Sequence, residues 1–342
     1  MVDLTPPVLV PSPLYNLQLM LEDLSGPRAG ALLGVAWDFG AFNAAAPVPA
    51  EFDLPGGWGL YAERLAAMSG IRLETHCSDE HEDAYDRLDF GQPVVLAVDS
   101  YQLPYRPAYR RVHSARTILA TRIDRPAGTA EIVDVWMPAY TGTIALADLD
   151  RARISAVPYD VRREPLYSGT PLHRRWWTLA LLGDPLMAQP SGIARALGFL
   201  AAQSAGGRLD PAEALEQSRR MIVAALAAPI AESQAIRRAA ALWLRGAIGL
   251  RAYLVSFLRL AAQLDNDALL AAEVAAWSAH LHQLACARDI VIKSTVFARA
   301  AYADLADRAL GNAVAREGRF IRFMGDLYGA EPSFARREQS SC

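Results

Sequence analysis

The 342-residue sequence has few cysteines and almost no net charge, and both shortages exclude classes of protein. Its 3 cysteines, Cys77, Cys286 and Cys342, are an odd number without CxxC spacing, which argues against a disulfide framework and a structural zinc site. Lys and Arg number 34 against 37 Asp and Glu, so the formal net charge is −3. That balance removes the electrostatic case for binding a nucleic acid.

Long apolar runs, targeting segments and common catalytic fingerprints are also missing. The run from Ala29 to Trp37 is too short to span a membrane, and the N-terminus lacks the basic and apolar regions of a signal peptide. We therefore expect a cytoplasmic protein without a membrane partner. No GxGxxG after a strand, GxxxxGK[ST], GxSxG or HExxH occurs. His280 and His282 fall on nearly opposite faces of a predicted helix, so we expect no metal and no cofactor.

Proline is scarce in the second half of the chain. Of the 21 prolines, 16 lie in residues 1–172, and Pro229 is the only one between residues 212 and 331. Because proline is excluded from helix interiors, this distribution predicts a turn-rich first domain over 1–172 and a helical second domain over 173–335. An alanine- and leucine-rich helical surface makes a homodimer plausible.

In the first domain, helices precede a sheet. Leucines at 14, 17, 21 and 24 predict a helix over 13–24, with Ser12 as its N-cap. Further helices are expected over 60–68, 79–88 and 146–154, and strands over 93–98, 117–123 and 131–136, the last two joined by a turn at 124–128. This order indicates an α+β fold with antiparallel pairs.

The second domain is predicted to be a helical bundle. Ser191 and the capping box that starts at Asp210 each open a helix. Longer helices are expected over 232–264, 267–292 and 295–328.

Several of these stretches resemble one family. The segment GQPVVLAVDSYQLPYRPAYRRVHS (91–114), the strand that follows it and VDVWMP (133–138) are similar to the N-terminal domain of the butirosin biosynthesis protein H family. SGIARAL (191–197) and GLRAYLVSFL (249–258) are similar to the C-terminal domain of that family. The resemblance implies a papain-like N-terminal domain followed by an all-α domain.

The resemblance also implies a Cys-His-Asp triad, from which this sequence departs. The cysteine position falls on Ser12 and the histidine position on Arg116, and only the aspartate matches, at Asp134. A serine hydroxyl is a poor nucleophile without an adjacent base, and arginine does not accept a proton. His113, three residues before Arg116, is an alternative base, and Arg116 is expected to pair with Asp134.

The altered site still predicts a cleft, lined by aromatic and polar groups. The candidate catalytic residues are His113, Arg116, Asp134, Ser12 and Tyr101. The candidate substrate-binding residues are Tyr15, Trp37, Asp99, Tyr105 and Trp136.

Three functions stay open from the sequence. The favoured one is an enzyme of specialised-metabolite biosynthesis that binds a polyketide or peptide intermediate, free or carrier-bound, and promotes acid–base chemistry such as ring closure by dehydration or conjugate addition. The second is an acyltransferase that moves an acyl group from a carrier protein to an amine or hydroxyl through Ser12 or Cys77. The third is a non-catalytic pseudoenzyme that binds a partner protein.

Overall fold

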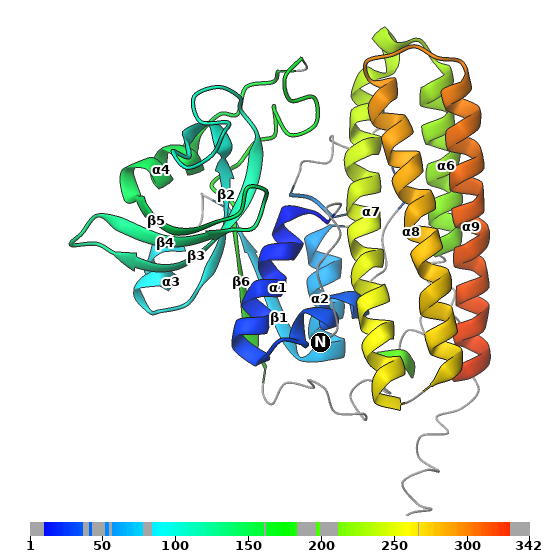
Figure 1. The fold of residues 1–342 in the computed structure, drawn as a ribbon, viewed down its shortest axis with the longest axis horizontal. Helices are drawn as coiled ribbons and strands as arrows, with labels where there is room; N and C mark the ends of the chain where they lie inside the picture. Colours follow the sequence, from blue (N-terminus) through cyan, green and yellow to red (C-terminus); the bar gives the residue numbers. More distant parts are fainter. Residues whose placement is uncertain are drawn as a thin grey trace, which may run out of the picture.

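The computed structural model consists of a sheet-containing part and a helical bundle, which lie side by side in Figure 1. The described residues are 10–36, 41–42, 52–54, 57–77, 84–160, 162–182, 196–198, 211–265 and 267–328. The first part holds six antiparallel strands and the second consists of long helices, which confirms the α+β class.

The sheet has the strand order β1-β6-β2-β3-β4-β5, and every neighbouring pair is antiparallel. The strands are β1 (Ile71–His76), β2 (Val94–Asp99), β3 (Ala115–Asp124), β4 (Thr129–Asp134), β5 (Tyr140–Ala145) and β6 (Trp176–Leu181). All six residues of β2 are buried because both faces of this strand are covered. The sixth strand, β6, lies beyond residue 172, where the sequence placed the end of the first domain.

Two apolar cores lie on opposite faces of the sheet. Val94, Leu96 and Val98 of β2 face the smaller core, under α3 (Ala84–Asp89) and α4 (Leu146–Ile154). Val95 and Ala97 face the larger core, which α1 (Ser12–Ser25), the 3-10 helix η1 (Ala29–Ala36) and α2 (Trp58–Ser69) share with the bundle. The alternation follows from the two-residue period of a strand.

Helix α1 is buried between the sheet and the bundle (Figure 1). Leu14, Leu17 and Leu21 have no exposed surface, and burying each such side chain contributes about 1.5–3 kcal/mol. Asn16 Nδ2 donates to Thr117 Oγ1 on β3 at 2.9 Å. On the other side of α1, the Tyr253 hydroxyl of α7 (Ile230–Asp265) donates to the backbone carbonyl of Leu14 at 3.1 Å. Polar contacts on both sides therefore fix α1 in place.

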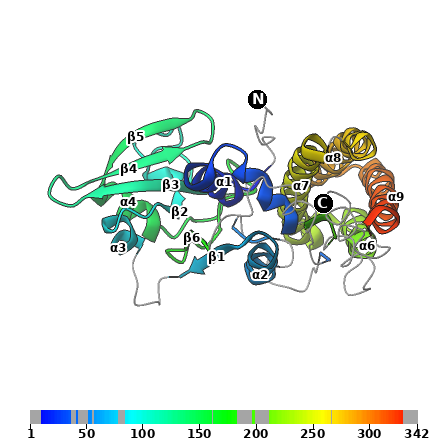
Figure 2. The same cartoon turned by 90° about the horizontal axis from the view of Figure 1, so that it is seen from below.

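The described helices of the second part form a closed bundle, seen end-on in Figure 2. Helix α6 packs on α7 and α9, and α8 packs on the same two helices. Their bounds are α6 (Pro211–Ala227), α7 (Ile230–Asp265), α8 (Ala268–Ser294) and α9 (Ala301–Tyr328). The segment Ile230–Leu264 is long and apolar enough to cross a bilayer, but 94% of its apolar window is buried inside the protein, as in a core helix.

The bundle contacts the first part closely through two glycines. A side chain at Gly34 in η1 would collide with the backbone carbonyl of Tyr253, and one at Gly249 in α7 would collide with the ring of Pro11. Only a residue without Cβ permits these approaches, so η1 and the start of α1 pack directly on α7.

Most predicted elements are confirmed, with three kinds of difference. The strands β1, β5 and β6 and the helix η1 were not predicted. The helix predicted over 79–88 is described only from Ala84, and the starts predicted at Ser191 and Asp210 lie outside the described residues. The predicted N-cap is wrong, because Pro11 is the N-cap of α1 and Ser12 is its first residue, without a side-chain cap.

Candidate functional site

The candidate catalytic residues lie at one end of the sheet. Strands β2 and β3 are antiparallel, so the last residue of β2, Asp99, lies opposite the first residue of β3, Ala115. The next strand, β4, ends at Asp134, also at this end. Helix α1 starts against the same part of β3, because the Ser12 hydroxyl accepts a hydrogen bond from the Thr117 N–H at 3.2 Å.

His113 and Asp99 form a closely held pair in front of β3. The imidazole Nδ1 lies 2.6 Å from Asp99 Oδ2, and the ring stacks on Tyr101 with centroids 3.9 Å apart. The His113 side chain is 25% exposed, whereas that of Asp99 is fully buried. Within the described residues, no partner is found for the other ring nitrogen, Nε2. The imidazole therefore combines a fixed orientation with partial access to solvent.

Asp99 is held by four hydrogen-bond donors. Its Oδ1 accepts from the backbone N–H groups of Tyr101 and Ser114, both at 3.0 Å. Its Oδ2 accepts from the Ser155 hydroxyl at 2.6 Å and faces His113. An ionised carboxylate only accepts hydrogen bonds, so this contact favours the tautomer of His113 in which Nδ1 carries the proton. Asp99, predicted to bind substrate, lies against His113 and Ser155 in the structure.

Ser12 is buried and occupied with backbone contacts. The residue is 3% exposed, and its Oγ accepts the Thr117 N–H. Arg116 directly precedes Thr117 in β3 and stands at the position where the family resemblance implies a histidine. Its guanidinium cannot accept the serine proton.

Asp134 is paired with Arg106, a residue that the sequence did not single out. Arg106 Nη1 lies 3.4 Å from Asp134 Oδ2, and the Tyr105 hydroxyl donates to the same oxygen at 3.1 Å. Burial raises the pKa of the Asp134 carboxyl above its usual value, although the charges of Arg106 and Arg116 oppose this rise. Burial and the neighbouring Asp134 also raise the pKa of Tyr105. Asp134 therefore pairs with Arg106, and the charge of Arg116, its predicted partner, also acts on this carboxyl.

Arg116 belongs to a stack of alternating cations and rings. Its guanidinium lies over the ring of Trp136 at 4.7 Å and over that of Tyr167 at 5.3 Å. Arg245 from α7 lies over the same two rings, at 5.5 and 4.9 Å. The stack joins β3, the segment after β4, the loop before β6 and the bundle.

A cavity of about 200 Å³ opens beside this stack, between the sheet part and the bundle. We call it the interdomain cavity. It contains one of the predicted substrate-binding residues, Trp136. The lining residues are Trp136, Leu166, Tyr167, Ala241, Leu242, Arg245, Arg288 and Ile292. The backbone N–H of Ala115 donates to the Tyr167 carbonyl at 3.1 Å, so the start of β3 links the cavity wall to the segment that carries His113.

Two predicted residues do not join these groups. Tyr15 is half-buried on α1, and burial, with the nearby charge of Glu22, raises its pKa. Within the described residues, Tyr15 makes no hydrogen bond or ring contact with His113, and it does not line the interdomain cavity. Trp37 lies outside the described residues.

The alternative nucleophile, Cys77, follows β1 and is partly exposed. The adjacent His76 stacks on Trp176 with ring centroids 3.8 Å apart and lies 3.7 Å from Glu74. In the described part of the chain, no three His, Cys, Asp or Glu residues are grouped so that they could hold a metal ion.

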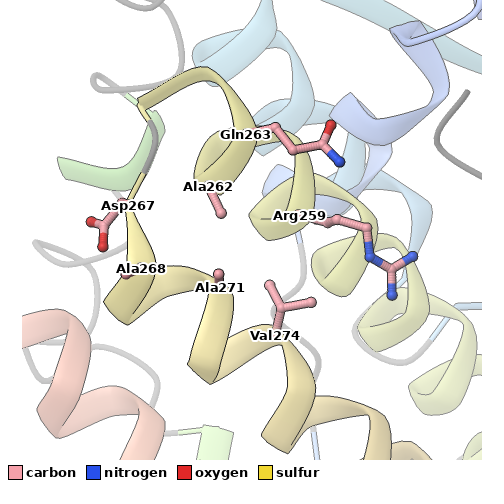
Figure 3. A pocket seen from close by; sticks show the side chains of 7 residues that line it. All are labelled: Arg259, Ala262, Gln263, Asp267, Ala268, Ala271 and Val274. Atoms are coloured by element: carbon pink, nitrogen blue, oxygen red, sulfur yellow. The ribbon is translucent and has the colours of Figure 1, made fainter.

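A second cavity, of about 370 Å³, lies where α7 meets α8 (Figure 3). Small side chains form most of its wall, and the charged ends of Arg259 and Asp267 lie on opposite sides of it. Asp267 already caps α8 by accepting from the N–H groups of Leu269 and Leu270. None of the predicted site residues lines this cavity.

The sequence reasoning missed Arg106, Ser155, Tyr167 and Arg245. Arg106 lies inside the segment that carried the resemblance, but no spacing rule connects it to Asp134. Arg245 lies in the bundle, far along the chain from its partner rings Trp136 and Tyr167. Contacts of this kind depend on the tertiary fold alone.

Comparison with known families identifies part of the first domain. Residues 32–135 match the model of butirosin biosynthesis protein H, N-terminal. The match includes Asp99, His113, Arg116 and Asp134, and its last residues adjoin Trp136. No curated protein matches the chain.

Proposed function

We propose that this protein, whose residues 32–135 belong to the N-terminal-domain family of butirosin biosynthesis protein H, acts in antibiotic biosynthesis. In that role it binds a polyketide or peptide intermediate, free or carrier-bound. It then promotes non-covalent acid–base chemistry on that intermediate, with His113 as the base.

The observation that supports this function is the pairing of His113 with the buried Asp99 at 2.6 Å. The carboxylate favours the imidazole tautomer with a proton on Nδ1, so that Nε2 accepts a proton from the substrate. The developing imidazolium charge then lies next to Asp99, which stabilises it. A general base of this kind typically contributes a factor of about 10²–10⁴ to the rate.

The chemistry that such a base supports is proton removal followed by loss of water or by addition within the same molecule. His113 takes the proton from a C–H next to a carbonyl, or from a hydroxyl. The electron pair then expels a hydroxide, or forms the new ring bond at an unsaturated carbon. The proton returns from the imidazolium to the leaving oxygen or to the carbon that has gained charge. A shaped site favours ring closure because it holds the two ends together.

Covalent acyl transfer is less well supported. The reaction requires an exposed nucleophile in contact with a base, whereas Ser12 is buried against the Thr117 N–H. His113 has its nearest partners in Asp99 and Tyr101. For these reasons we assign the base to His113 without assigning a nucleophile.

Replacement of the gene by variant alleles in the producing organism tests the proposal. His113→Gln should reduce the pathway product about a hundredfold or more and lead to accumulation of its precursor. Ser12→Ala should leave most of the product, and His282→Gln on α8 is a matched control that should have no effect. The products are quantified by mass spectrometry, and circular dichroism verifies that each purified variant is folded.

Three other outcomes would contradict the proposal. Loss of the product in Ser12→Ala, with an acyl adduct on the intact wild-type protein, would establish the acyltransferase function. An adduct that maps to Cys77 would do the same. Unchanged product in His113→Gln, together with complete loss on gene deletion, would establish a non-catalytic partner-binding function.

A further inference from the structure

The interdomain cavity combines flat aromatic walls with arginine side chains. Trp136 and Tyr167 supply two rings, Arg245 and Arg288 supply two guanidinium groups, and four aliphatic residues complete the lining. Arg245 is 3% exposed, so its charge is held inside the protein at the cavity wall.

We infer that this cavity binds a small planar ligand that carries a carboxylate. Its volume of about 200 Å³ exceeds the roughly 150 Å³ that accommodates benzene in an engineered apolar cavity, so one substituted six-membered ring fits. Trp136 and Tyr167 give the wall aromatic groups against which a flat ligand packs. Arginine is suited to the carboxylate because its planar fork donates two parallel hydrogen bonds.

The arginines are positioned before any ligand arrives. Arg245 Nη2 donates to the Val10 carbonyl at 3.1 Å, and its guanidinium lies over both aromatic rings. Arg288 is held by Asp289, with 2.6 Å between Nη2 and Oδ1. The Asp289 carboxylate is 53% exposed, so solvent screens it, and it competes only weakly with a ligand for Arg288. Side chains that are already ordered lose little conformational entropy on binding.

The cavity draws its lining from both parts of the protein. Ala241, Leu242 and Arg245 recur on one face of α7, and Arg288 and Ile292 lie one turn apart on α8. The identification of the ligand as a pathway intermediate rests on the proposed function, but the recognition of a planar carboxylate does not depend on His113.

Calorimetric titration of the full-length protein with 4-hydroxybenzoate tests the inference. The neutral isostere 4-hydroxybenzamide is the matched ligand. We expect saturable binding of the acid and at least tenfold weaker binding of the amide, because only the acid pairs with the guanidinium groups. Arg245→Gln and Arg288→Gln should each weaken acid binding about tenfold or more, and Ile292→Trp, which fills the cavity, should abolish it.

Arg259→Gln is the control variant, because Arg259 lies on the same helix but lines the other cavity. Equal affinity for acid and amide, no binding of either, or an equal loss in Arg259→Gln would overturn the inference. If Arg245→Gln fails to fold, Arg288→Gln and Ile292→Trp still decide the outcome. Retained binding by His113→Gln, alongside its loss of product in the organism, would separate failure of this site from failure of the proposed function.

Discussion

The most informative perturbation is Asp99→Asn, because it changes one atom of the pair that orients His113. The amide oxygen of the variant still accepts from the N–H groups of Tyr101 and Ser114. The amide nitrogen replaces Oδ2 and donates to the Ser155 hydroxyl and to His113 Nδ1. The proton of the imidazole is therefore expected to move from Nδ1 to Nε2. In that tautomer Nε2 is a donor and no longer acts as a base.

The free energy of unfolding should fall only moderately in this variant. Four hydrogen bonds of a charged carboxylate become hydrogen bonds of a neutral amide, but all four groups around it keep a hydrogen-bond partner, so we expect a loss of about 1–3 kcal/mol. Asp99→Ala is different, because it leaves the two backbone N–H groups and the Ser155 hydroxyl without their acceptor. At about 1–3 kcal/mol for each unsatisfied donor, that variant should lose about 3 kcal/mol or more.

Long-range proton–nitrogen correlation spectra of the ring nitrogens of His113 measure the tautomer directly, and urea denaturation measures stability. The wild type should show a protonated Nδ1, and Asp99→Asn a protonated Nε2 together with loss of product in the organism. Asp160→Asn is a suitable control, because Asp160 accepts the N–H groups of Arg162 and Arg163 at the surface. An unchanged His113 tautomer in Asp99→Asn would refute the role assigned to Asp99.

Two further predictions concern buried polar groups elsewhere. Glu317 is fully buried in the bundle, where Arg251 Nε and His280 Nε2 both contact its Oε1. Glu317→Gln should therefore lower the free energy of unfolding by about 3–5 kcal/mol, measured by urea denaturation. A loss below about 1 kcal/mol would contradict this expectation. Burial acts to raise the pKa of Glu317, but Arg251 and His280 outweigh it and lower that pKa, while burial lowers the pKa of His280. In both cases the unfolded chain binds more protons, so stability should fall as the pH decreases below about 6.5, and His280→Gln should remove the part of that slope between pH 7 and 5. For the family's nucleophile position, the thiol introduced by Ser12→Cys should react with iodoacetamide much more slowly than Cys77 in the native protein and at a similar rate after denaturation; fast native labelling would show that position 12 is open to solvent.

The sequence allowed prediction of the elements that have a strong local pattern. The leucine spacing of α1, the continuous apolar run of β2 and the turn between β3 and β4 all carry such a pattern, and each is found in the structure. At that turn, Asp124 Oδ1 accepts the Ala127 N–H and Gly128 has a φ of 67°, a conformation that favours glycine.

The missed strands lack such a pattern. In β1 only Ile71 and Leu73 are buried, and the remaining residues are charged or polar, so the strand has no continuous apolar run. β5 is half-exposed and lies at the edge of the sheet. β6 is a run of tryptophans and leucines beyond the proline-rich part, so it was assigned to the helical domain. Its neighbours β1 and β2 are distant in sequence, and no local rule predicts that pairing.

The candidate site was predictable in its residue types and less so in its pairings. His113 and Asp99 were both among the residues predicted for the site, but their contact required the register of β2 and β3. The cap assigned to Ser12 followed a local rule that a tertiary contact overrides, since its hydroxyl accepts the Thr117 N–H instead. Local chemistry thus identifies candidate residues, whereas their partners depend on the sheet.

The arginine at position 116 connects the loss of one chemistry to the properties of the cavity. At the position where the resemblance implies a base, this residue cannot accept a proton, so the remaining acid–base capacity falls to His113, which has its own buried carboxylate. The same guanidinium lies over Trp136, a wall of the interdomain cavity, and adds a cation to the ring face on the side of β3. Arg245 contributes the corresponding cation from the bundle. Under the proposed function, an arginine at this position removes the base that a triad needs and places a cation beside a wall of the proposed anion-binding cavity.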